Sequence, residues 1–218
     1  MLRSRVLQLN SSGEILGRVL LQRLCHVAVT TIVLAAAAAS ACGPSDVNPK
    51  VPPGAKSSGG GHAIIETDRG AIEIKFLEGD APRAVENFRL LAEHHYYDGL
   101  TFHRIIPGFM IQGGDPNGDG TGGQSAWGSE FPDEIKRDSA LYKGGYKRGL
   151  VAMANHGANT NGSQFFIMHQ DYDLRPDYVL FAWVTKGLDV VDALAGVPTS
   201  RDDRPLTPVV IKTVTIKP

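Results

Sequence analysis

Apolar and polar residues alternate in short runs through most of the chain beyond residue 61. This period of two is typical of β-strands that bury one face. The first two runs, residues 63–67 and 71–76, flank Asp68-Arg69-Gly70, and a glycine between alternating runs indicates a hairpin turn. The same pattern predicts further strands at residues 101–105, 109–112, 149–154, 163–168, 178–184 and 208–216.

Two segments show the 3.6-residue period of an amphipathic helix instead. In residues 80–95, Asp80 is expected to be the N-cap, Pro82 lies in the first turn, and apolar side chains recur on one face. Residues 189–194 form the second predicted helix. Strands punctuated by two helices indicate a mainly β domain, built as a closed sheet with capped ends.

The N-terminal region has a different composition. Its four arginines precede an apolar run at residues 27–39, and small residues follow before Cys42, which is the pattern of a secretory signal. The run of about 13 residues is shorter than the roughly 20 that span a bilayer. We therefore predict that residues 1–41 are a cleaved signal peptide.

The segment Ala39-Ser40-Ala41-Cys42-Gly43 resembles a bacterial lipobox, in which the cysteine is acylated and becomes the mature N-terminus. Ala39 departs from the usual leucine. We expect Cys42 to carry lipid, and the alternative is simple secretion after cleavage near Ala41. The expected location is the cell envelope, with the exported chain anchored to a membrane and facing the periplasm or the cell exterior.

Residues 42–61 are rich in proline, glycine and serine, a composition that buries too little apolar surface to order itself. They are predicted to be a flexible tether, which leaves residues 62–218 as the folded domain. Cys25 and Cys42 both precede this domain, so it can contain neither a disulfide nor a cysteine-ligated metal site.

The charge balance limits the classes of partner. The net charge of −1 combines +3 in residues 1–41 with −4 in the remainder of the chain. A mildly acidic body argues against nucleic-acid binding. The composition, 42% hydrophobic and 21% charged, is that of an ordinary globular protein, and we expect one core and a monomer.

Residues 101–116 bring a cation, amides and large apolar side chains together. Alternation places Phe102 and Arg104 on one face of a strand, the Pro107-Gly108 turn reverses the chain, and the returning strand carries Met110 and Gln112. The hairpin can thus surround a concavity with these side chains. Taken alone, the segment fits an ordinary hairpin with a solvated arginine equally well.

Residues 153–167 show a similar mixture of small, amide and aromatic side chains. Together the two stretches resemble the cyclophilin family of peptidyl-prolyl cis/trans isomerases, and the resemblance runs from about Ala63 to Lys217. It implies a closed eight-stranded antiparallel β-barrel capped by two α-helices. It also implies an enzyme that rotates Xaa-Pro bonds in unfolded or flexible polypeptides and needs no cofactor and no metal.

The resemblance assigns roles to individual residues. Arg104 would donate to the prolyl nitrogen of the twisted amide, and Phe109 and Gln112 would complete the catalytic group. The residues expected to bind substrate are Phe102, Met110, Ala154, Asn155, Gln164, Phe166, Leu174 and Tyr178. Tyr178 stands where the better-known eukaryotic pattern has histidine, and Tyr172-Asp173 where it often has tryptophan.

Other interpretations remain to be weighed. The glycines of residues 113–123 lack the Gly-Lys-Ser/Thr ending of a phosphate loop, and Ala126 stands where a calcium loop needs glutamate. We therefore expect a wide surface loop beside the site. Besides an isomerase that assists exported proteins to fold, the chain fits a module that holds proline-containing segments without turnover, or a structural envelope lipoprotein.

Overall fold

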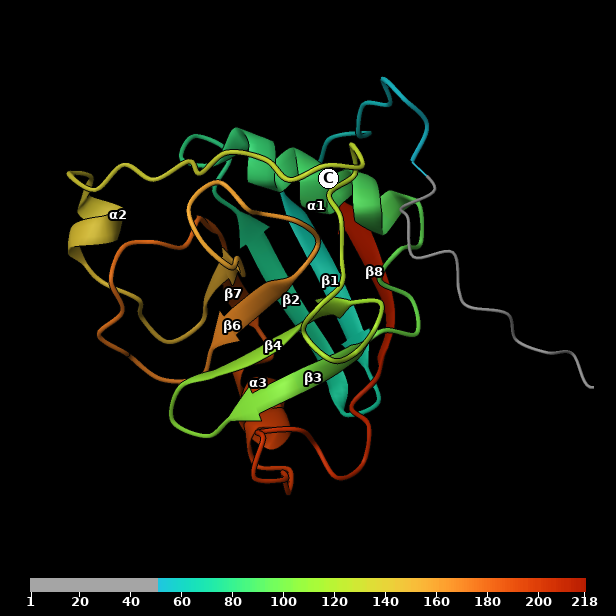
Figure 1. Cartoon of the computed structure of the whole chain (residues 1–218), viewed down its shortest axis with the longest axis vertical. Coiled ribbons are helices and arrows are strands. Elements are labelled where there is room, and N and C mark those ends of the chain that lie inside the picture. Colours follow the sequence, from blue (N-terminus) through green and yellow to red (C-terminus); the bar gives the residue numbers. More distant parts are fainter. Residues whose placement is uncertain (1–50) are drawn as a thin grey trace, which may run out of the picture. The chain divides into compact units, whose positions relative to one another are not determined.

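The computed structural model describes residues 51–218, and in them eight strands form one antiparallel sheet (Figure 1). The strands are β1 (His62–Thr67), β2 (Gly70–Phe76), β3 (Thr101–Ile106), β4 (Met110–Asp115), β5 (Leu150–Met153), β6 (Phe165–Met168), β7 (Leu180–Lys186) and β8 (Ile211–Lys217). Their order across the sheet is β3-β4-β6-β5-β7-β2-β1-β8. The prediction of a mainly β fold with eight antiparallel strands is confirmed.

The sheet curls, but its edge strands β3 and β8 do not pair along their length. A single bridge joins Thr101 to Val210, and the amide of Phe102 donates to the carbonyl of Val209 at 2.9 Å. The segment that precedes β8 therefore closes the gap through a few hydrogen bonds. The prediction of a fully closed barrel was therefore too strong, because no continuous ladder of hydrogen bonds joins β3 to β8.

Three helices accompany the sheet: α1 (Pro82–Glu93), α2 (Ala140–Lys143) and α3 (Leu188–Ala195). α1 and α3 are the two predicted helices, and they lie at opposite ends of the curled sheet (Figure 1). α2 is a single turn that the sequence pattern missed. Its N-cap is Ser139, whose side chain accepts a hydrogen bond from the amide of Tyr142.

The N-terminus of α1 is satisfied from a distant part of the chain. The N-cap is Ala81, not Asp80 as predicted, and no side chain next to it makes a capping bond. Instead the carboxylate of Glu134 accepts from the amides of Arg83 and Ala84 at 3.0 and 2.9 Å. A carboxylate at the positive end of the helix dipole also stabilises it electrostatically.

Side chains on the two faces of the sheet form separate apolar clusters. On β6, Phe165 and Ile167 belong to the inner cluster, which fills the curled sheet and includes the buried faces of α1 and α3. Phe166 and Met168 point the other way, into the outer cluster. The buried members of this outer cluster are Met110, Tyr142, Tyr146, Ala152, Phe166, Met168 and Leu180.

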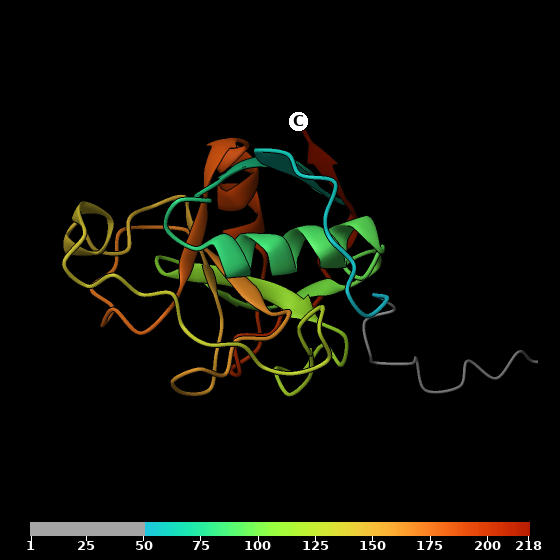
Figure 2. The same ribbon diagram turned by 90° about the horizontal axis from the view of Figure 1, so that it is seen from above.

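Residues 51–61, the second half of the predicted tether, lie along α1 (Figure 2). The carboxylate of Glu86 accepts from the amide and hydroxyl of Ser57 at 2.8 and 2.5 Å. The carboxylate of Glu93 holds Ser58 in the same way. Composition alone predicted flexibility here. Two glutamates on the same face of α1, Glu86 and Glu93, nevertheless give the segment fixed hydrogen-bond partners.

The remaining N-terminal predictions, which are the signal peptide at residues 1–41, the lipid on Cys42 and the tether up to residue 50, lie outside the described residues. Within residues 51–218, no helix is both long and apolar enough to cross a membrane.

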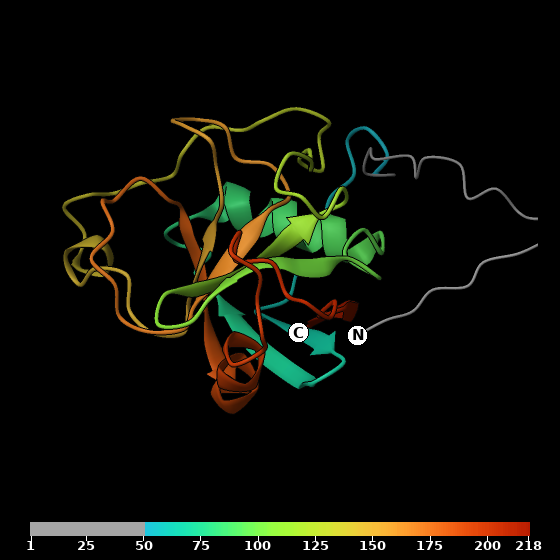
Figure 3. The ribbon, with the colours of Figure 1, turned by 60° about the horizontal axis from the view of Figure 1, so that its bottom comes forward.

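Two long loops lie side by side beyond one edge of the sheet (Figure 3). They cover residues 116–139 and 154–164, and they are joined by reciprocal hydrogen bonds between Asp133 and Asn159. Each residue's amide donates to the other's side-chain oxygen at 3.0 Å. This junction fixes the walls of the cavity described next.

Candidate active site

A β-bulge decides which side chains of β3 reach the outer face. The register with β4 shifts between Phe102 and Arg104, so that Phe102 pairs with Gly113 while Arg104 pairs with Gln112. A bulge inserts one residue and reverses the alternation beyond it. Phe102 is consequently fully buried in the inner cluster, and the prediction that it shares a face with Arg104 and binds substrate is wrong.

Arg104 lies on the outer side of the hairpin with 44% of its side chain exposed. Its Nε atom is 3.5 Å from a carboxylate oxygen of Asp203, which belongs to the loop before β8. Within residues 51–218, the guanidinium forms no hydrogen bond, so its N–H groups remain available to a ligand. A guanidinium stays charged at any physiological pH and presents its donors in a fixed plane.

The outer cluster supplies an apolar floor beside Arg104. Met110 and Phe166 are buried in it, and Phe109, Leu174 and Tyr178 are half-buried against it. The rings of Phe166 and Tyr178 meet edge to face, with centroids 5.3 Å apart. Met110 and Phe166 belong to β4 and β6, Phe109 directly precedes β4, and the other two lie in the segment before β7. That these five residues hold a prolyl ring remains a prediction.

Next to this floor is a cavity of about 560 Å³ with a polar lining. Gln112, Ala154, Asn155 and Gln164, all predicted site residues, line it together with the loop of residues 117–124. The amide of Gln112 donates to the side-chain oxygen of Gln164 at 2.8 Å, and Gln164 in turn donates to the carbonyls of that loop. The amides are therefore fixed before any ligand binds.

The glycine-rich wall of the cavity is organised by one buried carboxylate. Asp115 accepts hydrogen bonds from the backbone amides of Asn117, Asp119, Gly120 and Gly122. Its oxygens are thus occupied by the loop itself. This explains the calcium-like spacing without a metal, and within residues 51–218 no cluster of three metal-ligating side chains occurs.

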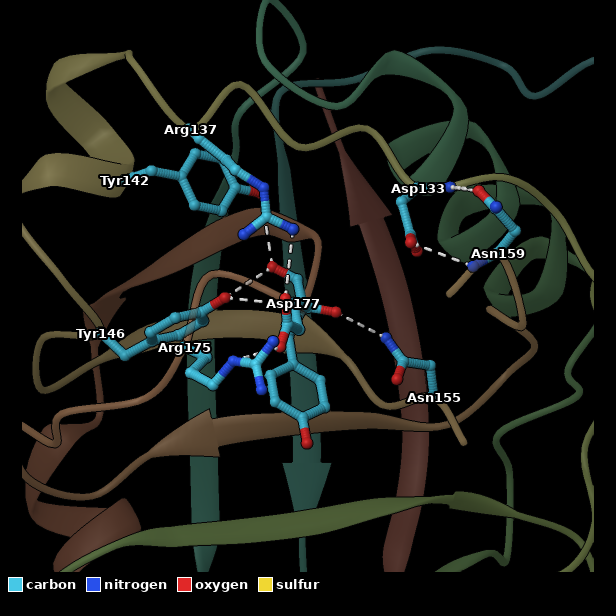
Figure 4. Close-up of polar contacts among 9 residues, drawn as sticks. Asp133, Arg137, Tyr142, Tyr146, Asn155, Asn159, Arg175 and Asp177 are labelled. Atoms are coloured by element: carbon cyan, nitrogen blue, oxygen red, sulfur yellow. Dashed lines mark hydrogen bonds and ion pairs between the residues drawn. The ribbon is translucent and has the colours of Figure 1, made fainter. Parts of the chain in front are cut away.

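A polar network that includes Tyr142, Tyr146 and Asp177 holds Asn155 (Figure 4), and it also holds the backbone of Tyr178. Asn155 donates from its side-chain amide to the carbonyl of Asp177 at 2.9 Å, which fixes this amide group at the cavity wall. The hydroxyls of Tyr142 and Tyr146 donate to the carbonyl of Tyr178 at 3.3 and 2.9 Å. Burial raises the pKa of Tyr142 to about 12, so both groups remain donors at neutral pH.

Several residues that shape the site carried no recognisable signal in the sequence. Tyr142 and Tyr146 belong to no motif, and they act through the backbone of a residue more than 30 positions away. Glu130 and His156, which line the cavity and lie 3.0 Å apart, are on different loops. Only Asp115 could have been suspected, because short polar residues before glycines often fix a loop.

Two further residues lie at the margin of the site. Asn161 is fully buried, and its side chain donates to the carbonyl of Phe131 and the carboxylate of Asp133. Tyr172, in the segment where the better-known eukaryotic pattern often has tryptophan, is 48% exposed and packs on the ring of Phe109 with centroids 4.3 Å apart.

The similarity to known proteins covers nearly all of the described domain. Residues 62–216 match the family described as cyclophilin type peptidyl-prolyl cis-trans isomerase/CLD. Peptidyl-prolyl cis-trans isomerase CYP18-1 of Arabidopsis thaliana is 45% identical over 153 residues, which are 70% of this chain and 93% of the relative. Peptidyl-prolyl cis-trans isomerase 9 of Schizosaccharomyces pombe is 48% identical over 162 residues, but the chain spans only 25% of that protein's length.

Solved structures agree with this assignment. The cyclophilin type peptidyl-prolyl cis-trans isomerase of Cryptosporidium parvum superposes with a TM-score of 0.68 and 34% identity, covering 73% of this chain and 99% of that one. A second structure of that protein, determined in the presence of the dipeptide Ala-Pro, gives a TM-score of 0.67 and 35% identity over 72% and 99% of the two chains.

Proposed function

Because the chain belongs to the family of cyclophilin-type peptidyl-prolyl cis-trans isomerases, we propose that it accelerates rotation about Xaa-Pro bonds by non-covalent stabilisation of the twisted amide. The observation that carries this proposal is the position of Arg104. Its unbonded guanidinium stands at the edge of an apolar floor and next to a row of fixed amides.

The reaction needs no bond to be made or broken. The barrier of about 18–20 kcal/mol comes from amide resonance, which is lost when the C–N bond twists. A catalyst must only bind the twisted form better than either planar form, and each ~1.4 kcal/mol of this preference gives about tenfold in rate. No group in the site is required to transfer a proton.

The residues of the site divide this task. The prolyl ring would rest on Phe109, Met110 and Phe166, which exclude water from one side of the amide. As the nitrogen becomes pyramidal it regains a lone pair, and Arg104 is the preorganised donor for it. Gln112 and Gln164, fixed by their mutual hydrogen bond, would hold the peptide backbone that leads into the cavity.

We further propose that the clients are proline-containing segments of exported proteins, on the basis of the signal-like N-terminus and the lipobox-like segment ending at Cys42. Binding of proline peptides by this chain is supported by the relative whose structure was determined with Ala-Pro. The proposed location is the cell envelope, with the domain tethered to a membrane by lipid on Cys42.

The direct test is a protease-coupled isomerisation assay on a proline tetrapeptide, with wild type compared to Arg104→Ala and Arg104→Lys. We expect Arg104→Ala to lower kcat/KM by roughly 10² to 10³, the effect of removing one preorganised donor. Lysine should restore little, because it lacks the planar fork. If Arg104→Ala keeps half of the wild-type activity with an unchanged circular dichroism spectrum, the proposed donor role of Arg104 is wrong.

A further inference from the structure

Phe109, part of the apolar floor, follows a tight turn whose central amide needs a partner from outside. The amide of Phe109 donates to the carbonyl of Ile106 at 3.0 Å, with Pro107 and Gly108 between them and Gly108 at a φ of 82°. This is the geometry of a type II turn, in which the amide of the second central residue takes no part in the turn's own hydrogen bond.

His169, the residue after β6, supplies that partner. Its Nδ1 atom accepts from the amide of Gly108 at 2.9 Å. The amide of His169 donates to the carbonyl of Phe109, also at 2.9 Å. The backbone on both sides of Phe109 is therefore attached to one residue, and one of the two attachments passes through a titratable ring that is only 16% exposed.

The opposite nitrogen of the ring faces α3. Nε2 of His169 lies 3.2 Å from a carboxylate oxygen of Asp192. Arg148 fixes Asp192 with two hydrogen bonds, at 2.6 and 2.9 Å, and also donates to the carbonyl of His169 at 2.7 Å. The arginine lowers the pKa of the Asp192 carboxyl, so the group facing Nε2 is an anion. These contacts define the neutral ring, with its proton on Nε2 and its lone pair on Nδ1.

We propose that His169 is a positioning residue for Phe109, and that it holds the floor of the groove in place only while its Nδ1 atom is unprotonated. The inference rests on the proposed function, since it treats Phe109 as part of the surface that binds the prolyl ring. A protonated ring has no acceptor, so the amide of Gly108 would face a second N–H group and the turn would shift.

The other charges around the ring do not replace this acceptor. Asp192 and Arg148 are the charged groups in direct contact with His169. Asp171 is turned away, towards the amide of Arg148 and the side chain of Lys147. The carboxylate of Asp192 can accept from Nε2 in either protonation state of the ring, whereas Gly108 loses its partner in one of them.

The consequence should appear in KM and not in kcat. Phe109 contacts planar and twisted forms of the substrate alike, and Arg104 has no link to His169 within residues 51–218. Loss of an interaction that is equally strong in the ground state and the transition state raises KM with little change in kcat. We expect His169→Ala to raise KM by about three- to tenfold at pH 8, the effect of losing one hydrogen bond. For wild type we expect a comparable rise in KM when acid protonates the ring and removes the acceptor at Nδ1.

His169→Asn separates positioning from general stability. Its side-chain oxygen can occupy the place of Nδ1 and accept from Gly108, but it cannot titrate. It should keep KM near the wild-type value at pH 8 and lose the rise in acid. The matched control is His95→Asn, which removes a histidine–aspartate pair at the end of α1, where a φ of 57° also suits asparagine. It should behave as wild type at every pH.

The experiment is steady-state kinetics of the full chain and these variants from pH 5.5 to 8, together with the NMR shift of the Gly108 amide over the same range. A wild-type KM that is flat with pH, or a His169→Asn variant with the same acid rise as wild type, would overturn the inference. If His169→Ala does not fold, the wild-type and asparagine profiles decide. If wild type turns over no substrate, the proposed function fails, and the Gly108 shift still shows whether His169 holds the turn.

Discussion

Asp203 is the residue on which the placement of Arg104 depends most directly. It has a φ of 60°, a backbone region that costs a non-glycine residue energy, and its carbonyl accepts from the amide of Ile105 at 2.8 Å. Its carboxylate faces Nε of Arg104. A strained residue that contacts a side chain with a proposed catalytic role is a candidate for a trade between stability and activity.

We therefore predict that Asp203→Gly raises the melting temperature slightly, because glycine accepts a positive φ freely, and lowers kcat/KM about two- to fivefold, the scale of an exposed ion pair. The measurements are thermal unfolding and the isomerisation assay on the same preparation. Full activity in a stabilised Asp203→Gly protein would mean that Arg104 needs no support from this loop.

His103, the extra residue of the bulge, is buried, and neither of its ring nitrogens has a hydrogen-bond partner among residues 51–218. Burial lowers its pKa, an effect that Asp115 opposes and Arg204 reinforces. The unfolded chain has the ordinary value of about 6.5. Below that pH the unfolded chain binds more protons, so this residue's contribution to the free energy of unfolding falls as the pH falls towards the folded pKa.

This predicts that His103→Leu flattens part of the loss of stability in acid. Urea unfolding at pH 7.5 and at pH 5 measures it. An equal loss for variant and wild type would assign the acid sensitivity to other groups. Because the substitution removes no hydrogen bond, its effect on the free energy of unfolding at pH 7.5 should be small.

At the scale of elements, α1 depends on a residue that lies about 50 positions away in the chain. The carboxylate of Glu134 accepts hydrogen bonds from two of the first backbone amides of the helix. No side chain at the N-cap bonds to these amides. Loss of a helix cap costs about 0.5–2 kcal/mol. We predict this loss for Glu134→Ala in urea unfolding.

Asp80→Ala is the matched control for this test, because Asp80 is the N-cap that local pattern selects and makes no capping bond. It should leave the free energy of unfolding nearly unchanged. The reverse ranking of the two variants would show that the local residue caps the helix in solution.

The local sequence pattern therefore predicted the strands and the two longer helices, but not the tertiary contacts that connect them. Alternation identified the strands, and the spacing of Pro82 and the apolar residues located α1. The bulge at His103 could not be predicted, because it depends on how β4 pairs across the hairpin. The same holds for the site: Gln112 and Gln164 followed from motifs, whereas Glu134 and the two tyrosines that clamp Tyr178 act through tertiary contacts.

For the whole molecule, the prediction with the largest consequence is that Cys42 carries lipid. The intact mass of protein extracted from the envelope should correspond to a chain that begins at Cys42 with acyl groups added, and Cys42→Ser should abolish the addition. A soluble product that begins at Gly43 or earlier, without added mass, would favour simple secretion.

If Cys42 carries lipid, the docking of residues 51–61 on α1 limits how far the domain can move from that anchor. From Cys42 to Val51 there are nine residues, which span at most about 30 Å, whereas the nineteen residues up to Gly61 would span about 65 Å. If Cys42 carries lipid, the packing of Val51 and Ala55 on the core, together with the hydrogen bonds from Ser57 and Ser58 to α1, would therefore halve the reach of the tether. An enzyme anchored in this way would meet its clients close to the lipid surface, within roughly its own diameter. Loss of the hydrogen bonds from the two serines would lengthen the free tether without altering the groove.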